Sequence, residues 1–180
     1  MRVIAGSAKG VRLAPVPSGT RPMSDRAREG LFSSLGERIA GARVLDLFAG
    51  TGAVGIEALS RGAESAVFVD PAPGAVATIR ENCRRAKVTK LATVRRTDAL
   101  RALRGEKGQF DLVIMDPPYR TPPPLLDSVL AELARRGTVA AGGFVVLTRE
   151  SQSYTPVIPL HWALERRLSY GDAVLLVFHT

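Results

Sequence analysis

The sequence has one cysteine, two histidines and no long uninterrupted apolar run. Because Cys83 has no second cysteine to pair with, the chain can form neither an internal disulfide nor a cysteine-based zinc site. Its apolar runs are shorter than the ~18 residues that a membrane-spanning helix needs. The N-terminus "MRVIAGSAKGVRLAP" also lacks the long apolar segment of a signal peptide. We therefore expect a cytoplasmic protein that is not attached to a membrane.

Acidic residues are also scarce. The chain has 25 Lys and Arg against 17 Asp and Glu, a net charge of +8 over 180 residues. Residues 1–40 hold seven basic side chains against three acidic ones, and residues 80–107 hold ten against three. Such clusters favour a polyanionic partner, because each neutralised phosphate releases condensed counterions. A generally basic surface that maintains solubility would give the same composition, so charge alone does not decide.

Strand-like and helix-like segments alternate from Arg43 onward. The expected strands cover 43–48, 65–70, 91–96, 110–115, 143–148, 161–169 and 173–178. Helical patterns cover 53–61, 73–86 and the stripe of Leu126, Leu130 and Ala134. This alternation predicts an α/β fold with a mostly parallel seven-stranded sheet covered on both faces. The last two strands meet at Gly171 without a helical pattern between them, so we expect a C-terminal antiparallel hairpin.

Residues 1–40 form a different, basic segment ahead of the domain expected over 41–180. Residues 1–19 are rich in Gly and Pro and suggest a small hairpin or arm. A helix follows, with Ser24 as its N-cap and Gly36 as its C-terminal stop. Its apolar stripe places Arg26 and Arg28 on other faces. We therefore predict a small N-terminal hairpin and helix extension.

The segment "LDLFAGTGAVG" carries Gly50, Gly52 and Gly55 in a G-x-G-x-x-G pattern, and Asp70 follows Gly50 by twenty positions. Taken alone, this pattern indicates a nicotinamide dinucleotide. However, Asp46 precedes the loop at the end of the same strand, where a pyrophosphate would bring negative charge. A carboxylate there suits a ligand with a cationic group instead, such as the amino-acid end of S-adenosylmethionine.

Further acids end the next two expected strands. Asp70 can accept hydrogen bonds from ribose hydroxyls, and Asp98 in "RTDAL" can accept one from an adenine amino group. Each of the three acids also has a structural interpretation: Asp46 and Asp70 in turns, and Asp98 as the N-cap of a helix holding Leu100 and Leu103. Together, at successive strand ends where open α/β sheets bind ligands, they favour the cofactor interpretation.

The tetrapeptide Asp116-Pro117-Pro118-Tyr119 follows the fourth expected strand. Its two prolines exclude both helix and sheet and hold the chain in a preset loop, which suits catalytic positioning. The Asp116 carboxylate and the Pro117 carbonyl can together accept both hydrogens of an exocyclic amine. Tyr119 offers a ring on which an unpaired base can stack. The loop therefore suits the binding of an unpaired base through its exocyclic amine.

These residues carry a specific resemblance. "DLFAGTGAVGIEAL" and "DPPY" are similar to motifs I and IV of S-adenosylmethionine-dependent amino-methyltransferases. The opening "RVIAGSAKGVRLAPVPSGTRPMSDRAREGLFSSL" resembles the N-terminus of the bacterial 16S ribosomal RNA guanine-N2 methyltransferases (the RsmD type), and the match extends over essentially the whole chain. The resemblance implies a Rossmann-like class I methyltransferase that modifies 16S ribosomal RNA, within the small ribosomal subunit or an assembly intermediate. It departs from the family at Asp70, where the family usually has Glu.

With the motifs, the resemblance assigns candidate site residues. We expect a monomer that uses S-adenosylmethionine and no metal. The expected catalytic residues are Asp116, Pro117 and Tyr119. The expected S-adenosylmethionine-binding residues are Asp46, Phe48, Gly50, Gly52, Asp70, Asp98, Ala99 and Asp116. The expected RNA-binding residues are Arg2, Lys9, Arg12, Arg21, Arg26, Arg28 and Arg120.

Three alternatives remain at this point. The same cofactor could serve another amine, in adenine of DNA or RNA or in protein glutamine, because the tetrapeptide also serves such substrates. A non-catalytic RNA-binding or assembly factor could retain the fold, although the intact Asp116 and glycine loop argue against it. A dehydrogenase is the weakest alternative, because the remaining residues cannot easily supply a substrate domain.

Overall fold

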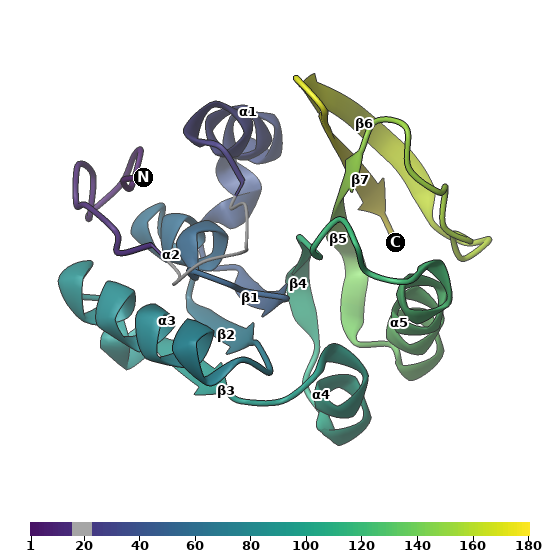
Figure 1. Cartoon of the computed structure of the whole chain (residues 1–180), viewed down its shortest axis with the longest axis horizontal. Helices are drawn as coiled ribbons and strands as arrows, with labels where there is room; N and C mark the ends of the chain where they lie inside the picture. The colour runs from purple at the N-terminus through teal and green to yellow at the C-terminus, as the bar shows by residue number, and fades with distance from the viewer. Residues whose placement is uncertain (16–22) are drawn as a thin grey trace.

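The computed structural model describes residues 1–15 and 23–180. In this part of the chain, seven strands form one sheet in the order β3-β2-β1-β4-β5-β7-β6 (Figure 1). Neighbours from β3 to β5 pair in parallel, and β7 pairs antiparallel with both β5 and β6. The predicted mostly parallel sheet with a C-terminal antiparallel hairpin is therefore confirmed. Among the described helices, none is long and apolar enough to cross a membrane.

The secondary structure follows the predicted alternation. The strands are β1 Arg43–Leu47, β2 Ser65–Val69, β3 Ala92–Arg95, β4 Phe110–Met115, β5 Val139–Glu150, β6 Ala163–Tyr170 and β7 Ala173–His179. The α-helices are α1 Asp25–Leu35, α2 Ala53–Ser60, α3 Pro73–Arg85, α4 Ala99–Gly105 and α5 Pro123–Arg136. Two short 3₁₀ helices, η1 Gly36–Ile39 and η2 Thr89–Leu91, connect these elements. Ser24 caps α1 by accepting the Ala27 N–H, as predicted.

Both faces of the sheet are buried under helices. Figure 1 shows α1, α2 and α3 on one side of the sheet and α4 and α5 on the other. Successive strand residues point to opposite faces, so Val44 of β1 packs in the first layer and Leu45 in the second. This explains why the central strands have continuous apolar runs rather than alternating ones.

Some boundaries differ from the sequence prediction. β5 begins at Val139 rather than at residue 143, because its pairing with β4 continues across a bulge between Phe110 and Leu112. The sequence shows no strand pattern at the start of β5, because Gly142 and its neighbours are small residues. Gly142 also has a φ of 76°. β6 begins at Ala163 because the Trp162 N–H closes a turn onto the Pro159 carbonyl.

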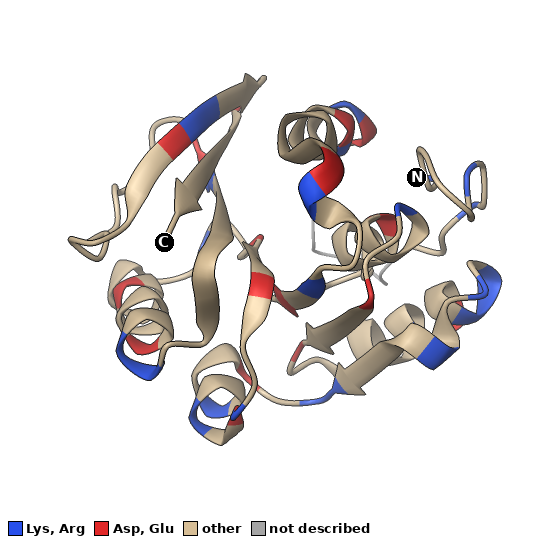
Figure 2. Cartoon of the chain, turned by 180° about the vertical axis from the view of Figure 1, so that it is seen from behind, with Lys and Arg blue, Asp and Glu red and all other residues tan. Residues whose placement is uncertain are grey.

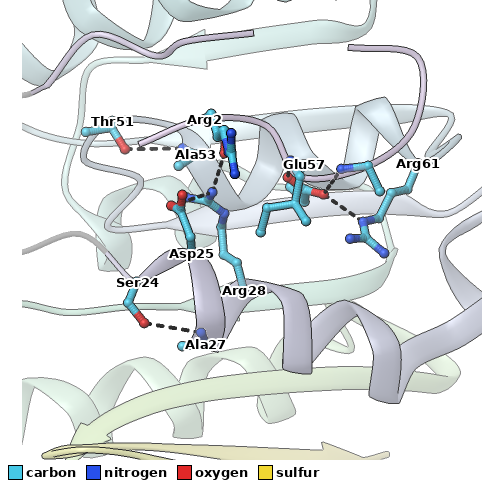
Figure 3. A network of polar contacts seen from close by, with 11 residues as sticks. Arg2, Ser24, Asp25, Ala27, Arg28, Thr51, Ala53, Glu57 and Arg61 are labelled. Atoms are coloured by element: carbon cyan, nitrogen blue, oxygen red, sulfur yellow. Dashed lines mark hydrogen bonds and ion pairs between the residues drawn. The ribbon is translucent and has the colours of Figure 1, made fainter. Parts of the chain in front are cut away.

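The described part of the N-terminal segment forms a hairpin-like turn held by an antiparallel bridge between Arg2 and Arg12. Hydrogen bonds join its backbone to side chains of α2 and α3. The buried Glu57 carboxylate accepts the N–H groups of Ile4 and Ala5 at 2.8 and 3.0 Å, and Asn82 bonds both backbone groups of Ala14. Figure 3 shows Glu57 between this segment and Arg61. The segment is thus packed against the sheet domain.

Gly55, the third glycine of the loop pattern, sets how closely α2 approaches β2. A Cβ atom at Gly55 would lie 2.4 Å from the fully buried ring of Phe68 and 3.1 Å from Asp46 Oδ2. The residue therefore has a packing role that is separate from ligand binding.

This packing predicts that Gly55→Ala lowers the free energy of unfolding by about 1–3 kcal/mol, because the buried ring has to move. Gly74→Ala is the matched control: Gly74 lies in the first turn of α3 and a Cβ there meets nothing within 4 Å. The control should be neutral or slightly stabilising. Urea unfolding of both variants measures the difference, and equal effects would contradict the proposed packing role.

Candidate active site

The candidate site lies at the carboxyl ends of β1, β2 and β4. β1 pairs with β2 on one side and with β4 on the other. The chain therefore adds β2 and β3 on one side of β1 and then β4 and β5 on the other side. Open α/β sheets bind ligands in the crevice at such a switch point. The glycine loop, Asp46, Asp70 and Asp116 all belong to segments that end at this edge. The structure therefore brings the main predicted site residues to one edge.

The loop between β1 and α2 has an unusual backbone. Phe48, Gly50 and Gly52 have φ values of 63°, 55° and 74°, a left-handed conformation that only glycine adopts without cost. Its presence at the non-glycine Phe48 marks a strained position, of the kind that concentrates at ligand sites. Gly52 directly precedes α2, which leaves the first N–H groups of that helix pointing toward this edge.

Asp70 fixes this loop from the neighbouring strand. Its Oδ2 accepts the Gly50 N–H at 2.9 Å, and its Oδ1 accepts the Ala72 N–H at 2.9 Å. The carboxylate therefore spans the gap between the ends of β1 and β2. An ionised carboxylate has about four acceptor positions, so these two bonds leave capacity for a ligand hydroxyl.

Asp46 lies beneath the loop, as predicted, and is 1% exposed. Its Oδ2 accepts the Gly55 N–H at 3.1 Å. Burial raises the pKa of Asp46 to about 8; the Gly55 hydrogen bond opposes this, and the negative charges of Asp116 and Asp70 add to it. Three carboxyl groups thus repel one another at this edge, and a cation bound beside them would favour their ionised forms.

Asp98 has the structural role that the sequence left open. Its Oδ1 accepts the Arg101 N–H at 2.8 Å and caps α4, while the side chain remains exposed. The buried Ala99 begins the same helix. A cap of this kind is compatible with a further hydrogen bond from a ligand, so both residues stay candidates for cofactor contact.

The Asp116 carboxyl lies directly after β4, with Pro117 buried and Tyr119 40% exposed. Burial raises the pKa of Asp116 to about 6. The Thr148 hydroxyl and the Met23 backbone N–H interact with the carboxyl and act in the opposite direction. A turn in which the Thr121 N–H bonds the Pro118 carbonyl closes the loop. The predicted acceptor is therefore a partly desolvated carboxyl on a fixed backbone.

The predicted RNA contacts separate into two groups. The side chains of Arg2, Lys9, Arg12, Arg26 and Arg120 are exposed. Figure 2 shows further basic positions on α3 and β6. Arg21 lies outside the described residues.

Arg28 does not lie on the surface, contrary to the expectation of a phosphate contact. It is 0% exposed, and its Nη2 donates to the Arg2 carbonyl and to Asp25 Oδ1 at 3.1 Å (Figure 3). Desolvation lowers the pKa of this guanidinium. The helix turns Arg28 inward because Arg28 shares one side of α1 with the buried Leu31 and Leu35. Arg28 joins α1 to the N-terminal segment rather than facing solvent.

Sequence reasoning missed Met23 and Thr148 beside Asp116, and Glu57 beneath the N-terminal segment. Glu57 had a signal, since it is the one charged residue in "AVGIEALS", a helix that is buried along its whole length. Met23 and Thr148 had none, because their places depend on how α1 and β5 pack beside β4.

Two surface depressions lie at the amino ends of the parallel strands, away from the three carboxyls. One is lined by Arg38, Phe144 and His179, and the other by Arg43, Lys107 and Arg136. Within residues 1–15 and 23–180, no cluster of three or more His, Cys, Asp or Glu side chains could hold a metal ion.

Known proteins resemble this chain over nearly its whole length. The family model described as "Conserved hypothetical protein 95" matches residues 1–179. YlbH of Bacillus subtilis (strain 168) is 38% identical over 176 residues, which are 95% of this chain and 94% of that protein. "Ribosomal RNA small subunit methyltransferase D" of Escherichia coli (strain K12) is 32% identical over 99% of this chain and 89% of its own length. The solved structure of yhhF from Escherichia coli has a TM-score of 0.88 at 32% identity, covering 99% of this chain and 97% of that one.

The raised pKa of Asp46 predicts an unusual dependence of stability on pH. Between the ordinary pKa of 3.8 and about 8, the folded protein holds a proton that the unfolded chain has released, so stability contributed by this group falls as pH rises. Asp46→Asn stays neutral and keeps a hydrogen-bond acceptor. We expect it to match the wild type near pH 4 and to exceed its melting temperature near pH 9, by roughly 2–4 °C per kcal/mol of relieved repulsion.

Thermal unfolding of the ligand-free protein from pH 4 to 9 tests this expectation. Asp111→Asn is the control, because Asp111 is half-exposed and pairs with Arg43 at the opposite edge of the sheet. If the difference in melting temperature between Asp46→Asn and the wild type does not grow with pH, the raised pKa assigned to Asp46 is wrong.

Proposed function

Because the chain belongs to the family described as Conserved hypothetical protein 95, we propose that it transfers a methyl group from S-adenosylmethionine to the exocyclic N2 of a guanine in 16S ribosomal RNA. The resemblance to the bacterial guanine-N2 methyltransferases is confirmed as a family relation over nearly the whole chain. One observation carries the proposal: an acceptor carboxyl, Asp116, lies at the same edge as two further carboxyls and a left-handed glycine loop.

The residues at this edge fit the cofactor. S-adenosylmethionine supplies an electrophilic methyl group on a positively charged sulfur, together with a cationic amino group. Asp46 and its acidic neighbours suit these positive charges, whereas they would repel a pyrophosphate. The Gly50 and Gly52 backbone permits close approach of the cofactor, and Asp70 keeps acceptor positions for ribose hydroxyls. Asp98 and Ala99 would contact the adenine. The dehydrogenase alternative is therefore disfavoured on charge.

Asp116 and the Pro117 carbonyl hold the target amine. Guanine N2 is a weak nucleophile because its lone pair is delocalised into the ring. Hydrogen bonds from its two N–H groups to these acceptors favour a pyramidal nitrogen whose lone pair points toward the methyl group. As the N–C bond forms, the C–S bond breaks and its electron pair stays on sulfur. The nitrogen loses one proton, which Asp116 can accept and pass to solvent.

RNA binding and location belong to the same proposal. Tyr119 offers an exposed ring for stacking the target base, and the exposed basic side chains of the N-terminal segment, α1 and the Arg120 loop supply phosphate contacts. We propose that the protein acts as a monomer on the small ribosomal subunit or an assembly intermediate, in the cytoplasm.

Asp116→Ala should lower methyl transfer by roughly 100-fold or more, while the affinity for S-adenosylmethionine changes little. Radiolabelled cofactor with unmodified small subunits, naked RNA, DNA and protein as acceptors measures this, followed by nucleoside analysis of the product. Asp111→Ala, at the far edge of the sheet, should retain activity. Label found only in adenine or only in protein would refute the guanine assignment, and loss of cofactor binding in Asp116→Ala would refute the acceptor role.

Arg26 and Arg28 form a matched pair that separates RNA contact from folding. Arg26→Gln should weaken RNA binding, because its side chain is exposed. The slope of the logarithm of the binding constant against the logarithm of the salt concentration should become shallower by about 1. Arg28→Gln should instead lower the melting temperature, because its side chain is buried against Arg2 and Asp25. Filter binding at several salt concentrations and thermal unfolding measure the two effects. An unchanged salt slope for Arg26→Gln would remove it from the RNA-binding surface.

A further inference from the structure

Thr148 carries a buried hydroxyl beside the catalytic loop. It lies in β5, which pairs in parallel with β4 so that Leu147 is opposite Met115. One step further along both strands places Thr148 beside Asp116. Thr148 is 4% exposed, and among the described residues its Oγ1 has no partner within ordinary hydrogen-bond geometry. Buried hydroxyls nearly always have such a partner, so this one requires an explanation.

The hydroxyl belongs to the face of the sheet that holds Asp116. Val146 packs in the layer under α1 and Leu147 in the opposite layer, so alternation along the strand returns Thr148 to the α1 face. Met23, directly before α1's cap residue, brings its backbone N–H to Asp116 from the same side. The Asp116 carboxyl therefore lies between a donor of β5 and a donor of the segment preceding α1.

We propose that Thr148 is a positioning residue for methyl transfer: its hydroxyl donates to one oxygen of Asp116 and leaves the other oxygen directed at the target amine. The inference rests on the proposed function and deepens it. A carboxyl that can rotate presents its oxygens in many directions, whereas two donors from different elements fix its plane. Thr148 interacts with Asp116 in this structure without meeting ordinary hydrogen-bond geometry, and the bond is completed when the amine holds Asp116 in place.

The surrounding charges make these donors important. Asp46 faces Asp116 from β1, and Asp70 lies beyond it, directly after β2. From α1, Asp25 is paired with Arg28. Arg149 follows Thr148 on β5, but it points to the other face and donates to the Tyr154 carbonyl. Since Thr148 and Met23 are the groups that favour the ionised Asp116, removing the hydroxyl favours the protonated form, which cannot accept both hydrogens of the amine.

Thr148→Val, which replaces the hydroxyl by a methyl group of similar size, tests this role. We expect kcat at pH 7 to fall roughly 10- to 100-fold, with KM and the affinity for S-adenosylmethionine nearly unchanged. The acidic limb of the kcat profile should move to higher pH, so that activity recovers in alkali. Thr148→Ser should restore most of the rate. Thr138→Val is the matched control, because Thr138 is equally buried but directly precedes β5 at the opposite edge.

A measurement that does not depend on activity separates this inference from the proposed function. In protein labelled with ¹³C at aspartate carboxyls, the Asp116 signal is identified by its loss in Asp116→Asn and titrated in the wild type and in Thr148→Val. A higher pKa of Asp116 in Thr148→Val supports the inference even if guanine proves to be the wrong acceptor. An unchanged pKa, an unchanged kcat profile, or failure of Thr148→Ser to restore the rate overturns it.

Discussion

Three carboxyl groups lie close together at the carboxyl edge of β1, β2 and β4, with Asp46 and Asp70 buried and Asp116 partly buried, and the surrounding structure compensates for their desolvation and repulsion. Backbone N–H groups donate to two of these carboxyls: Gly55 donates to Asp46, and Gly50 and Ala72 donate to the two oxygens of Asp70. The Gly50 N–H belongs to the loop in which Phe48, Gly50 and Gly52 adopt left-handed backbone angles. A buried negative cluster is costly without a positive charge beside it. The arrangement therefore suits a cationic ligand. A dinucleotide would fit this glycine loop poorly, because the neighbouring carboxyls would repel its pyrophosphate.

The N-terminal extension is part of this site rather than an independent arm. Val3 and Leu13 share a core with α1 and with Val44 of β1. Glu57 and Asn82 hold the backbone of the segment, and Arg28 links it to the first turn of α1 (Figure 3). The residue before that turn's cap, Met23, reaches Asp116. If RNA phosphates bind the exposed arginines of this extension, as we propose, they would lie on a body that also touches Asp116.

The sequence predicted the fold and the chemistry of the edge better than it predicted individual roles. Strand–helix alternation depends on local periodicity, so the seven strands and the terminal hairpin could be anticipated, although β5 extends past a bulge that small residues concealed. Asp46, Asp70 and Asp116 could be found because strand ends in a parallel sheet converge. Arg28 was assigned wrongly, because charge alone does not reveal which face of α1 is turned inward. Thr148 could not be found, because the Asp116–Thr148 proximity is created by pairing between strands about thirty residues apart.

The electrostatics of the edge also couple cofactor binding to the ionisation of its carboxyls. Burial raises the pKa of Asp46 to about 8 and that of Asp116 to about 6, so near neutral pH Asp46 is mainly protonated and Asp116 is mainly ionised. A cationic cofactor placed first would favour ionisation of both carboxyls. Asp116 would then meet the incoming base as a fully ionised acceptor, which matches the paired N–H donors of guanine. The cost of burying these acids is therefore offset by a cationic cofactor, and the effect on ionisation is largest at Asp46.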